Sequence, residues 1–323
     1  MKAKWTVAVL AAVLAFGPAG AGQPQAEAFN VSGGGAACEE FSACRPALVV
    51  DGTRVFVVWV ERAEDGTAVL MLARSTNGGD TFFPPQAVEV TRARGTQQPS
   101  LAVVSNGNLI LAWSDQRTGD FDVYLAFSND NGATWSWGPD REAINISGND
   151  GDSLQPSLVG NGAGMFAVAW SDNSVDARVN PSGARDGFLR AGIDPGQTGV
   201  QFPSLGDAIN VSRRFTPTRQ SPAERPALAL NGDLPAEVFV AWQQRGVGDE
   251  DVFFHQSAGF FPINVSDTPT VPSREPVIAA HRAAGGVPGV QVVLAWTEQS
   301  GSRSRILSQS TSGAGVSLTL PDF

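Results

Sequence analysis

Two sets of polar residues recur along the chain at positions that could carry chemistry. The first set stands two residues after a tryptophan that ends an apolar stretch, and it comprises Glu61, Asp115, Asp172, Gln244 and Glu298. Two carboxylates that face each other across a pocket can act as acid and base in the hydrolysis of a glycosidic bond. The candidate catalytic residues are therefore Asp115 opposite Glu298, or Glu61 opposite Asp172.

The second set stands directly before a proline that opens an apolar stretch. Its members are Arg45, Gln98, Gln155, Arg225 and Glu275. Guanidinium, amide and carboxylate groups are the kinds of polar group that orient a ligand in a pocket. The same residues could instead cap turns and join neighbouring strands, and for any single member this structural role is the simpler interpretation. Further arginines stand near both sets, at Arg62, Arg117, Arg245 and Arg274.

A fivefold repeat sets the positions of both groups. Each unit begins with a polar residue and a proline, and its second strand ends in Trp59, Trp113, Trp170, Trp242 or Trp296, at spacings of 54, 57, 72 and 54 residues. Third strands are expected at 68–74, 122–127, 187–191, 251–256 and 303–308. Fourth strands are clearest at 143–147, 208–212 and 262–266. Four short strands per unit predict an all-β propeller of four-stranded antiparallel blades. We expect five blades, or six if the two chain ends build a composite blade.

Two octets carry a more specific signature. Residues 128–135 read Ser-Asn-Asp-Asn-Gly-Ala-Thr-Trp, and residues 75–82 are a degenerate copy in which Asn77 and Phe82 replace the aspartate and the tryptophan. Both octets resemble the Asp box, S-x-D-x-G-x-T-W, of the sialidase-like (BNR repeat) β-propellers. In such a turn the Asx side chain caps backbone donors, glycine accepts a positive φ and the aromatic residue plugs the blade.

The resemblance also implies where a ligand would bind. In this family the loops that enter the innermost strand and those that leave the second strand open on one face, and the Asp-box turns lie on the opposite face. The implied ligand-binding residues, at the mouth of the central channel, are Arg45, Gln98, Gln155, Arg225, Glu275, Gln244 and Arg117.

Sialidase chemistry needs residues that this chain does not supply at the expected places. Sialidases of the family use an arginine trio, a tyrosine nucleophile with a glutamate partner, an aspartate acid/base and a Phe/Tyr-Arg-Ile-Pro motif. Arg45-Pro46 lacks the aromatic residue and the isoleucine, and the sole tyrosine, Tyr124, falls in a third strand beside an Asp box. We expect a non-catalytic module that binds a glycan or a protein partner. The alternatives are an exo-glycosidase with a divergent carboxylate pair and a repeat protein of envelope organisation.

The ends of the chain and its charge indicate an exported protein. Residues 1–21 combine Lys2 and Lys4, an apolar run and small residues, as in a secretory signal peptide, and the run is too short to span a bilayer. A Gly-rich lead-in at 22–45 and a single propeller domain at 46–323 would follow, secreted or periplasmic and monomeric. Removal of the two lysines changes the formal net charge from −10 to −12, which argues against nucleic-acid and anionic-membrane partners.

Cys38 and Cys44 lie six residues apart in the lead-in, and in an oxidising compartment a local disulfide is expected there. With His255 and His281 as the sole histidines, haem attachment and a zinc site are poor alternatives, and no metal or cofactor is expected. The acidic turns at 149–152 and 249–251 are compatible with Ca²⁺ but lack a full calcium-loop spacing.

Two further patterns bear on how the propeller is held together. Four Asn-x-Ser sequons begin at Asn30, Asn145, Asn210 and Asn264, and because they share one repeat position, a turn-holding asparagine explains them more simply than glycosylation. Residues 28–32 copy the fourth-strand pattern ahead of the first unit, and residues 316–320 could take the same place. Either segment could pair with the last unit and remove its free edge.

Overall fold

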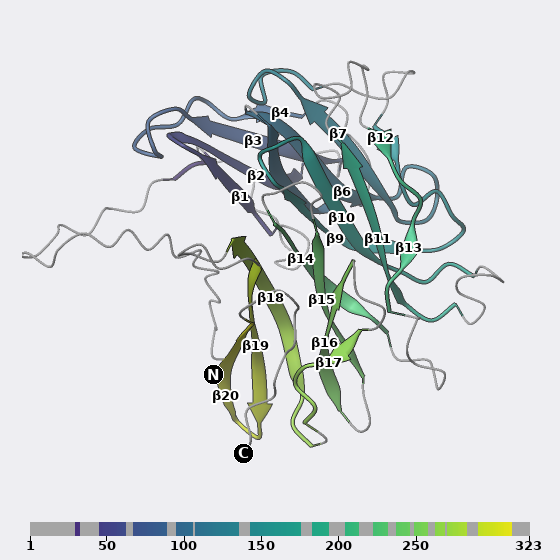
Figure 1. Cartoon of the computed structure of the whole chain (residues 1–323). Coiled ribbons are helices and arrows are strands. Elements are labelled where there is room, and N and C mark those ends of the chain that lie inside the picture. Colours follow the sequence, from purple (N-terminus) through teal and green to yellow (C-terminus); the bar gives the residue numbers. More distant parts are fainter. Residues whose placement is uncertain are drawn as a thin grey trace, which may run out of the picture. The chain divides into compact units, whose positions relative to one another are not determined.

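The computed structural model describes residues 30–32, 45–62, 67–88, 95–105, 107–135, 143–175, 183–193, 204–212, 222–231, 237–245, 249–257, 262–268, 270–282 and 290–311. The chain divides into two units, Met1–Asn30 and Val31–Phe323, and every strand described belongs to the second unit (Figure 1). The predicted signal peptide, the cysteine pair and residues 316–320 lie outside the described residues. In the described part of the chain, no helix is long and apolar enough to cross a membrane.

Five antiparallel sheets follow one another along the described chain, one for each predicted blade. Blade 1 holds β1 (Ala47–Asp51), β2 (Arg54–Arg62), β3 (Ala68–Ser75) and β4 (Gln86–Ala87). Blade 2 holds β5 (Gln97–Ser105), β6 (Asn108–Asp115), β7 (Asp122–Ser128) and β8 (Ile144–Asn145). Blade 3 holds β9 (Ser153–Gly160), β10 (Met165–Asp172), β11 (Asp186–Ile193), β12 (Ser204–Leu205) and β13 (Ile209–Asn210). Blade 4 holds β14 (Glu224–Leu230), β15 (Val238–Arg245), β16 (Glu250–Gln256) and β17 (Ile263–Asn264). Blade 5 holds β18 (Ser273–Arg282), β19 (Val290–Ser300) and β20 (Arg303–Thr311).

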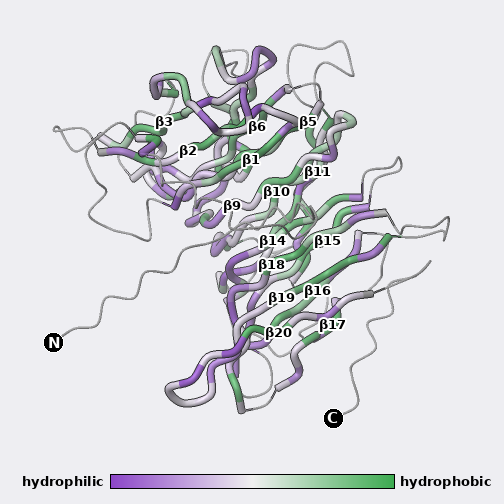
Figure 2. Tube along the Cα trace, turned by 90° about the vertical axis from the view of Figure 1, so that its left-hand side faces the viewer, coloured by the Kyte–Doolittle hydropathy of each residue, from purple (hydrophilic) through white to green (hydrophobic). Residues whose placement is uncertain are grey.

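The all-β propeller fold predicted from the repeats is confirmed, with two differences in strand number. Blade 3 carries two short outer strands, β12 and β13, on its third strand, and blade 5 has three strands among the described residues. The hydrophobic residues concentrate in the middle of the long strands, while hydrophilic residues gather at strand ends and turns (Figure 2). This distribution follows from strands that bury both faces between neighbouring sheets.

An apolar layer between neighbouring blades forms the core. Trp113 packs in a cluster with residues of blade 1, and Trp170, Trp242 and Trp296 each pack in the same way against the blade before their own. The side of blade 2 that faces the next blade carries both small and large apolar residues, such as Ala112, Leu125 and Phe127. Each blade therefore has a tryptophan face turned toward its predecessor and a second face turned toward its successor.

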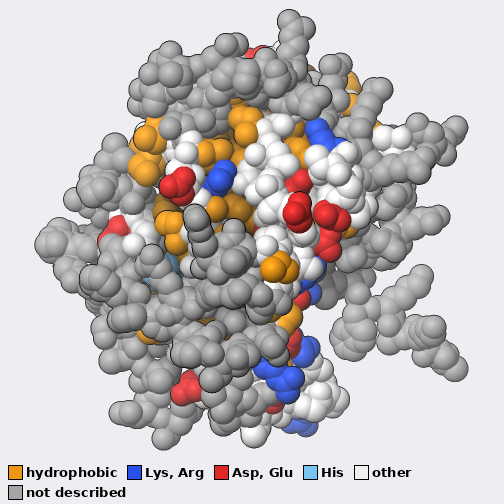
Figure 3. Space-filling model, turned by 90° about the vertical axis from the view of Figure 1, so that its right-hand side faces the viewer, with side chains coloured by type: hydrophobic (Ala, Val, Ile, Leu, Met, Phe, Trp, Pro, Cys, Tyr) orange, Lys and Arg blue, Asp and Glu red, His pale blue; other side chains and the backbone are white. Residues whose placement is uncertain are grey.

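Blades 1 and 5 each have one face that lacks this cover. Trp59 of blade 1 is half-buried, whereas the other four repeat tryptophans are at most 6% exposed. Leu48 on the same face is 54% exposed, and on the opposite face of blade 5 Val277 and Ile306 are 60% and 79% exposed. A surface view shows apolar side chains exposed among charges of both signs (Figure 3). Among the described residues, the buried clusters join blades 1 to 2, 2 to 3, 3 to 4 and 4 to 5.

The Asp-box octets have the structure that their sequence indicates. Ser128 Oγ accepts the Gly132 N–H at 2.8 Å, and Asp130 accepts the backbone N–H and the hydroxyl of Thr134 at 2.8 and 2.6 Å. Gly132 has a φ of 77°, and Trp135 is buried in the layer between blades 1 and 2. In the degenerate octet, the Asn77 amide oxygen accepts the Thr81 N–H at 3.1 Å, and Asn77 Nδ2 donates to Thr81 Oγ1 at 2.9 Å. The side-chain bond is reversed in direction, but the asparagine replaces the aspartate without loss of the turn.

The sequon asparagines hold fourth strands, as the repeat position suggested. Asn145 Nδ2 donates to Asp122 at 2.9 Å, Ser147 Oγ donates to the same carboxylate at 2.8 Å, and Val123 N–H donates to Ser147 Oγ at 3.0 Å. The same three-residue lock recurs as Asp186, Asn210 and Ser212, and as Asp251, Asn264 and Ser266. The Asn145 amide oxygen also accepts the Gly148 N–H at 2.8 Å, which closes the turn that follows β8.

The stability of the fold at acid pH tests the contribution of the Asp130 carboxylate to the Asp-box turn. Burial alone would raise the pKa of Asp130, but hydrogen bonds from Thr134, Ser128 and Ala133 outweigh it and leave the pKa below its ordinary value. The stabilisation is thus present above the unfolded pKa of about 4 and is lost as the pH falls through the folded pKa. We expect Asp130→Asn, which copies Asn77, to fold normally and to lose less stability than the parent between pH 5 and pH 3 in urea titrations. An equal loss of stability between pH 5 and pH 3 in the two proteins would contradict this account.

A close approach of two blades gives a second prediction. A Cβ added to Gly160 in β9 would lie 2.0 Å from the backbone oxygen of Val103 in β5. We expect Gly160→Ala to lower the free energy of unfolding by about 3 kcal/mol, because one backbone must move away from the other. Gly206→Ala is the matched control, since its Cβ would lie an ordinary 3.5 Å from the Ala191 oxygen. Similar urea midpoints for both variants would show that the blades separate freely at this point.

Candidate functional site

The polar residue before the proline has an unusual backbone in four of the five inner strands. Gln98, Gln155, Arg225 and Glu275 have φ values of 55°, 58°, 53° and 55°. At each of them the pairing of the inner strand with the second strand shifts register. Proline cannot donate to the ladder, so a bulge is where a paired strand can accommodate it. A left-handed conformation outside glycine costs about 1–3 kcal/mol, and specific contacts must hold it.

Side chains of the preceding blade supply those contacts. The Gln155 N–H donates to Gln98 Oε1 at 2.7 Å, and the Arg225 N–H donates to Gln155 Oε1 at 2.7 Å. The Glu275 N–H donates to Gln243 Oε1 at 3.0 Å, and the Arg225 guanidinium forms an ion pair with the Glu275 carboxylate. In blades 3, 4 and 5, the backbone donor that the bulge turns away from the ladder is therefore satisfied by the preceding blade.

The five residues before the prolines line one cavity of about 500 Å³, which we call the mouth pocket. Apolar groups complete its wall, including the four prolines that follow Gln98, Gln155, Arg225 and Glu275 and, from blade 5, Val277 and Ile306. Arg45 is exposed and hydrogen-bonds no residue in the described part of the chain. With two arginines and Glu275, the mouth pocket carries one net positive charge on a chain of formal charge −10.

The candidate catalytic carboxylates share one contact, because each accepts the indole N–H of the tryptophan two residues earlier. Trp59 donates to Glu61 at 2.8 Å and Trp113 to Asp115 at 2.7 Å. The other pairs are Trp170 with Asp172 at 3.1 Å and Trp296 with Glu298 at 3.5 Å. Gln244 accepts from Trp242 in the same way at 2.9 Å. None of these acceptors lines the mouth pocket.

Other donors occupy the remaining carboxylate oxygens. Asp172 is fully buried and also accepts Ser153 Oγ at 2.6 Å, Asn149 Nδ2 at 2.7 Å and the Ser174 N–H at 2.8 Å. Glu298 is 1% exposed and accepts the Arg305 guanidinium at 2.7 Å. Hydrogen bonds of this number fix a buried carboxylate in place and leave it no free face for a substrate.

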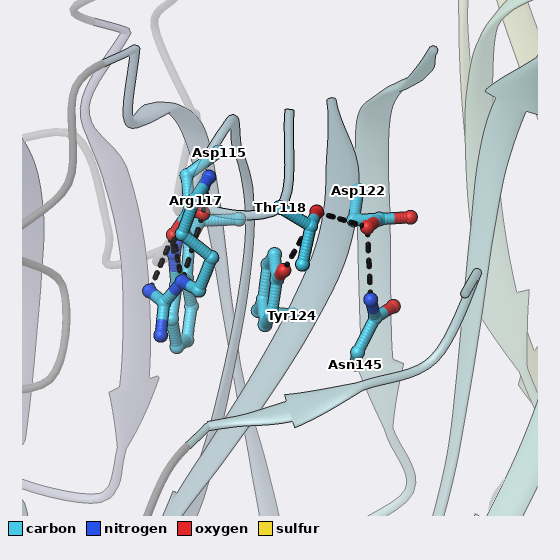
Figure 4. Close-up of polar contacts among 7 residues, drawn as sticks. Asp115, Arg117, Thr118, Asp122, Tyr124 and Asn145 are labelled. Carbon is cyan, nitrogen blue, oxygen red and sulfur yellow. Dashed lines mark hydrogen bonds and ion pairs between the residues drawn. The ribbon is translucent and has the colours of Figure 1, made fainter. Parts of the chain in front are cut away.

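Half-buried Arg117 and buried Tyr124 contact this group of residues, as Figure 4 shows for Arg117 and Asp115. Neither residue lines the mouth pocket. The Arg117 guanidinium pairs with Asp115 and lies 4.2 Å from the centre of the Tyr124 ring. The Tyr124 hydroxyl lies 3.3 Å from Thr118 Oγ1, and Thr118 donates to Asp122 at 2.7 Å. Burial raises the pKa of the Tyr124 phenol, against an opposing hydrogen bond from Thr118. The sole tyrosine is therefore a packing residue of blade 2, 2% exposed.

The remaining arginines and acidic turns are spread over other places. Arg245 and Arg274 line a second cavity of about 390 Å³ beside Glu224, Asp249 and Glu250, and Arg274 pairs with Glu250. The Arg62 side chain lies outside the described residues. In the described part of the chain, no group of three or more His, Cys, Asp or Glu side chains is placed to hold a metal ion.

Two features of the site were absent from the sequence interpretation. The apolar wall of the mouth pocket was missed, although the prolines that form part of it had marked the repeats. The use of the carboxylates as indole acceptors was also missed. Strand geometry held the signal, because residues i and i+2 lie on the same face of a strand and a tryptophan can reach forward to the acceptor.

Comparisons with known proteins place the fold. No protein-family model and no curated protein matches the sequence. Among solved structures, the Hadza microbial sialidase Hz136 matches with a TM-score of 0.50 at 15% identity, over 85% of this chain and 57% of that one. A protein of unknown function from Dyadobacter fermentans matches with a TM-score of 0.49 at 13% identity, over 85% and 80% of the chains. An α-L-arabinofuranosidase from Lactobacillus brevis gives 0.44 at 10% identity, over 84% and 91%.

The chain spans a little over half the length of the Hz136 chain, and at 15% identity the likeness concerns the fold alone. The succession of antiparallel blades, the two Asp-box turns and this superposition agree with one another. The chain therefore has a β-propeller fold similar to that of the Hz136 structure.

Proposed function

We propose that the chain is an exported, non-catalytic propeller that binds a glycan at the mouth pocket. The observation that carries this proposal is the distribution of carboxylates. The mouth pocket contains one, Glu275, which is paired with Arg225, while the carboxylates two residues after each tryptophan are held elsewhere by indole donors. Hydrolysis by acid and base needs two carboxyl groups on opposite sides of the same bond, about 5–9.5 Å apart.

The chemistry of the wall supports a sugar ligand. The rim of the mouth pocket presents hydrogen-bond donors and acceptors from Arg45, Arg225 and Glu275. Such groups can bind two neighbouring hydroxyl groups of a sugar. The prolines, Val277 and Ile306 offer apolar surface, which suits the C–H faces of a pyranose ring. Because the bulges are braced by neighbouring blades, the rim is positioned before a ligand arrives, and less ordering entropy is lost on binding.

Export is supported by the signal-peptide character of residues 1–21 and by an arginine-only, acidic remainder. The signal-peptide character and the mouth pocket together favour a secreted or periplasmic monomer that binds a glycan in this pocket. The Hz136 protein is named a sialidase, and the fold it shares with this chain hosts both enzymes and binding modules.

A binding test addresses the mouth pocket directly. The purified mature chain should bind members of a glycan array, and Arg45→Ala should weaken that binding at least about tenfold, because Arg45 has its guanidinium free for a ligand. The double variant Arg225→Ala/Glu275→Ala should abolish binding. Arg303→Ala, in the β19–β20 turn away from the pocket, is the matched control and should bind as the parent does.

Three outcomes would contradict the proposal. Glycan binding that survives every mouth variant would place the site elsewhere, and capture of a protein partner without any glycan binding would assign the pocket to that partner. Turnover of aryl glycosides, a sialoside included, that disappears in Asp115→Ala/Glu298→Ala would establish a carboxylate glycosidase.

Stability measurements test the role assigned to the buried carboxylates. Asp172→Asn turns an amide NH₂ toward groups that are themselves donors, so we expect a loss of about 2–3 kcal/mol in the free energy of unfolding. Glu61→Gln is the matched control, because Gln244 already serves as indole acceptor in blade 4, and its cost should stay below about 1 kcal/mol. If Asp172→Asn unfolded at the urea concentration of the parent, the structural role of Asp172 would be wrong.

A further inference from the structure

Two glutamines of the mouth pocket have side-chain amides that are fixed in one orientation. Gln98 Oε1 accepts the Gln155 N–H at 2.7 Å, and Gln155 Oε1 accepts the Arg225 N–H at 2.7 Å. A backbone N–H can only donate, so the atom that faces it must be the amide oxygen and not the amide nitrogen. The joint between two blades therefore decides which end of each amide is left for a ligand.

The end that is left is the Nε2 group, which carries two hydrogen-bond donors and no acceptor. In the described part of the chain, no group accepts a hydrogen bond from Gln98 Nε2 or Gln155 Nε2. Neither nitrogen is buried without a partner, and both half-buried side chains line the mouth pocket. Both amide nitrogens are therefore accessible to a ligand in this pocket.

Arg45 adds further donors from the blade before Gln98. Its exposed guanidinium lines the same pocket and, like the two amide nitrogens, can only donate. The inner strands of blades 1, 2 and 3, which are β1, β5 and β9, pack side by side in this order. We call Arg45, Gln98 and Gln155, which these three successive blades carry, the donor side of the mouth pocket. The hydroxyl groups of Ser100 and Ser157 also line the pocket and can donate as well.

We propose that the donor side binds an oxyanion of the glycan, a carboxylate or a sulfate group, so that the ligand is an acidic sugar. This inference rests on the proposed function, because it names the class of glycan that the mouth pocket takes. A sugar hydroxyl both donates and accepts, and beside a row of donors it must direct its own hydrogen elsewhere. A carboxylate or sulfate oxygen only accepts, and hydrogen bonds to a charged acceptor are stronger than those to a neutral one.

The opposite polarity of blades 4 and 5 suits the rest of the sugar. Glu275 is the one carboxylate among the residues that line the pocket, and it is paired with Arg225. Because like charges repel, Glu275 directs an oxyanion toward the donor side. The Arg225–Glu275 pair offers donors and an acceptor to sugar hydroxyl groups, and Val277 and Ile306 beside it are apolar. The pocket is thus polarised along the ring of blades.

Matched pairs of glycans test the ligand class on the unaltered mature chain. The array holds uronate oligosaccharides beside their methyl esters, and sulfated galactosides beside the unsulfated ones. We expect the acidic member of a pair to bind and its neutral counterpart to bind at least about tenfold more weakly. A preference in the uronate pairs identifies a carboxylate as the oxyanion, and a preference in the sulfated pairs identifies a sulfate.

Two results of the array would overturn the inference and are distinguishable from each other. Neutral glycans that bind as tightly as the acidic ones, with binding lost in Arg45→Ala, would overturn the acidic ligand and leave glycan binding at the mouth pocket intact. Failure of every glycan to bind would overturn the proposed function together with this inference.

Exchange of one amide nitrogen for oxygen tests the donor side itself. Gln155→Glu keeps an oxygen that accepts the Arg225 N–H, so the joint between blades 3 and 4 remains, but its second oxygen is an acceptor that repels an oxyanion. Gln98→Glu makes the same exchange at the joint between blades 2 and 3. We expect each variant to keep the urea midpoint of the parent and to bind the acidic glycan at least about tenfold more weakly.

Gln299→Glu is the matched control, because it makes the same change of charge at an exposed position of β19 that does not line the pocket. It should bind the acidic glycan as the parent does. Parent affinity in both Gln98→Glu and Gln155→Glu, or an equal loss of affinity in Gln299→Glu, would overturn the proposal.

Discussion

The buried indole N–H is the constraint from which much of this structure follows. Blades 2 to 5 each pack a tryptophan against the blade before them, and the aromatic body supplies the apolar contact between sheets. An indole donor in such a layer needs an acceptor, and the residue two positions later on the same strand face provides it. The indole N–H groups therefore bind the carboxylates that the sequence made candidates for acid–base chemistry. Packing between blades thus decides what remains available for a ligand.

What remains is the rim built by the proline bulges. The bulge frees the backbone N–H of the residue before the proline, and an amide oxygen from the preceding blade accepts it. The side chain of the same residue lines the mouth pocket. Gln98 and Gln155 therefore join blades as well as lining the pocket, whereas Arg45 contacts no other described residue through a hydrogen bond. The structural interpretation of this set therefore holds for Gln98 and Gln155, whose side chains join blades, while ligand binding at the rim is a proposal.

The sequence allowed the architecture to be predicted in detail and the site only in outline. Strand ends were marked by Pro46 and Trp59 and their repeats, so the predicted stretch 55–59 falls within β2 (Arg54–Arg62). The grouping of Arg45, Gln98, Gln155, Arg225 and Glu275 in one cavity also followed from the repeat. The left-handed backbone at these positions could not be foreseen, since proline usually favours an extended residue before it. Gln244 and Arg117 were assigned to the mouth pocket, yet they lie in the indole layer, because sequence spacing does not reveal which partner a side chain reaches first.

The direction of the packing has a consequence for how the molecule comes apart. Since blades 2 to 5 each pack a tryptophan against the blade before them, the blades form a stack with one direction, in which each blade is coupled to its nearest neighbours. Among the described residues, blades 2, 3 and 4 pack against a neighbouring blade on both faces, while blades 1 and 5 do so on one face. Trp59 and Ile306 lie on the other faces. Unfolding should then begin with these outer members and proceed inward. The joint between blades 2 and 3, where two backbones touch at Gly160, would be among the last to open.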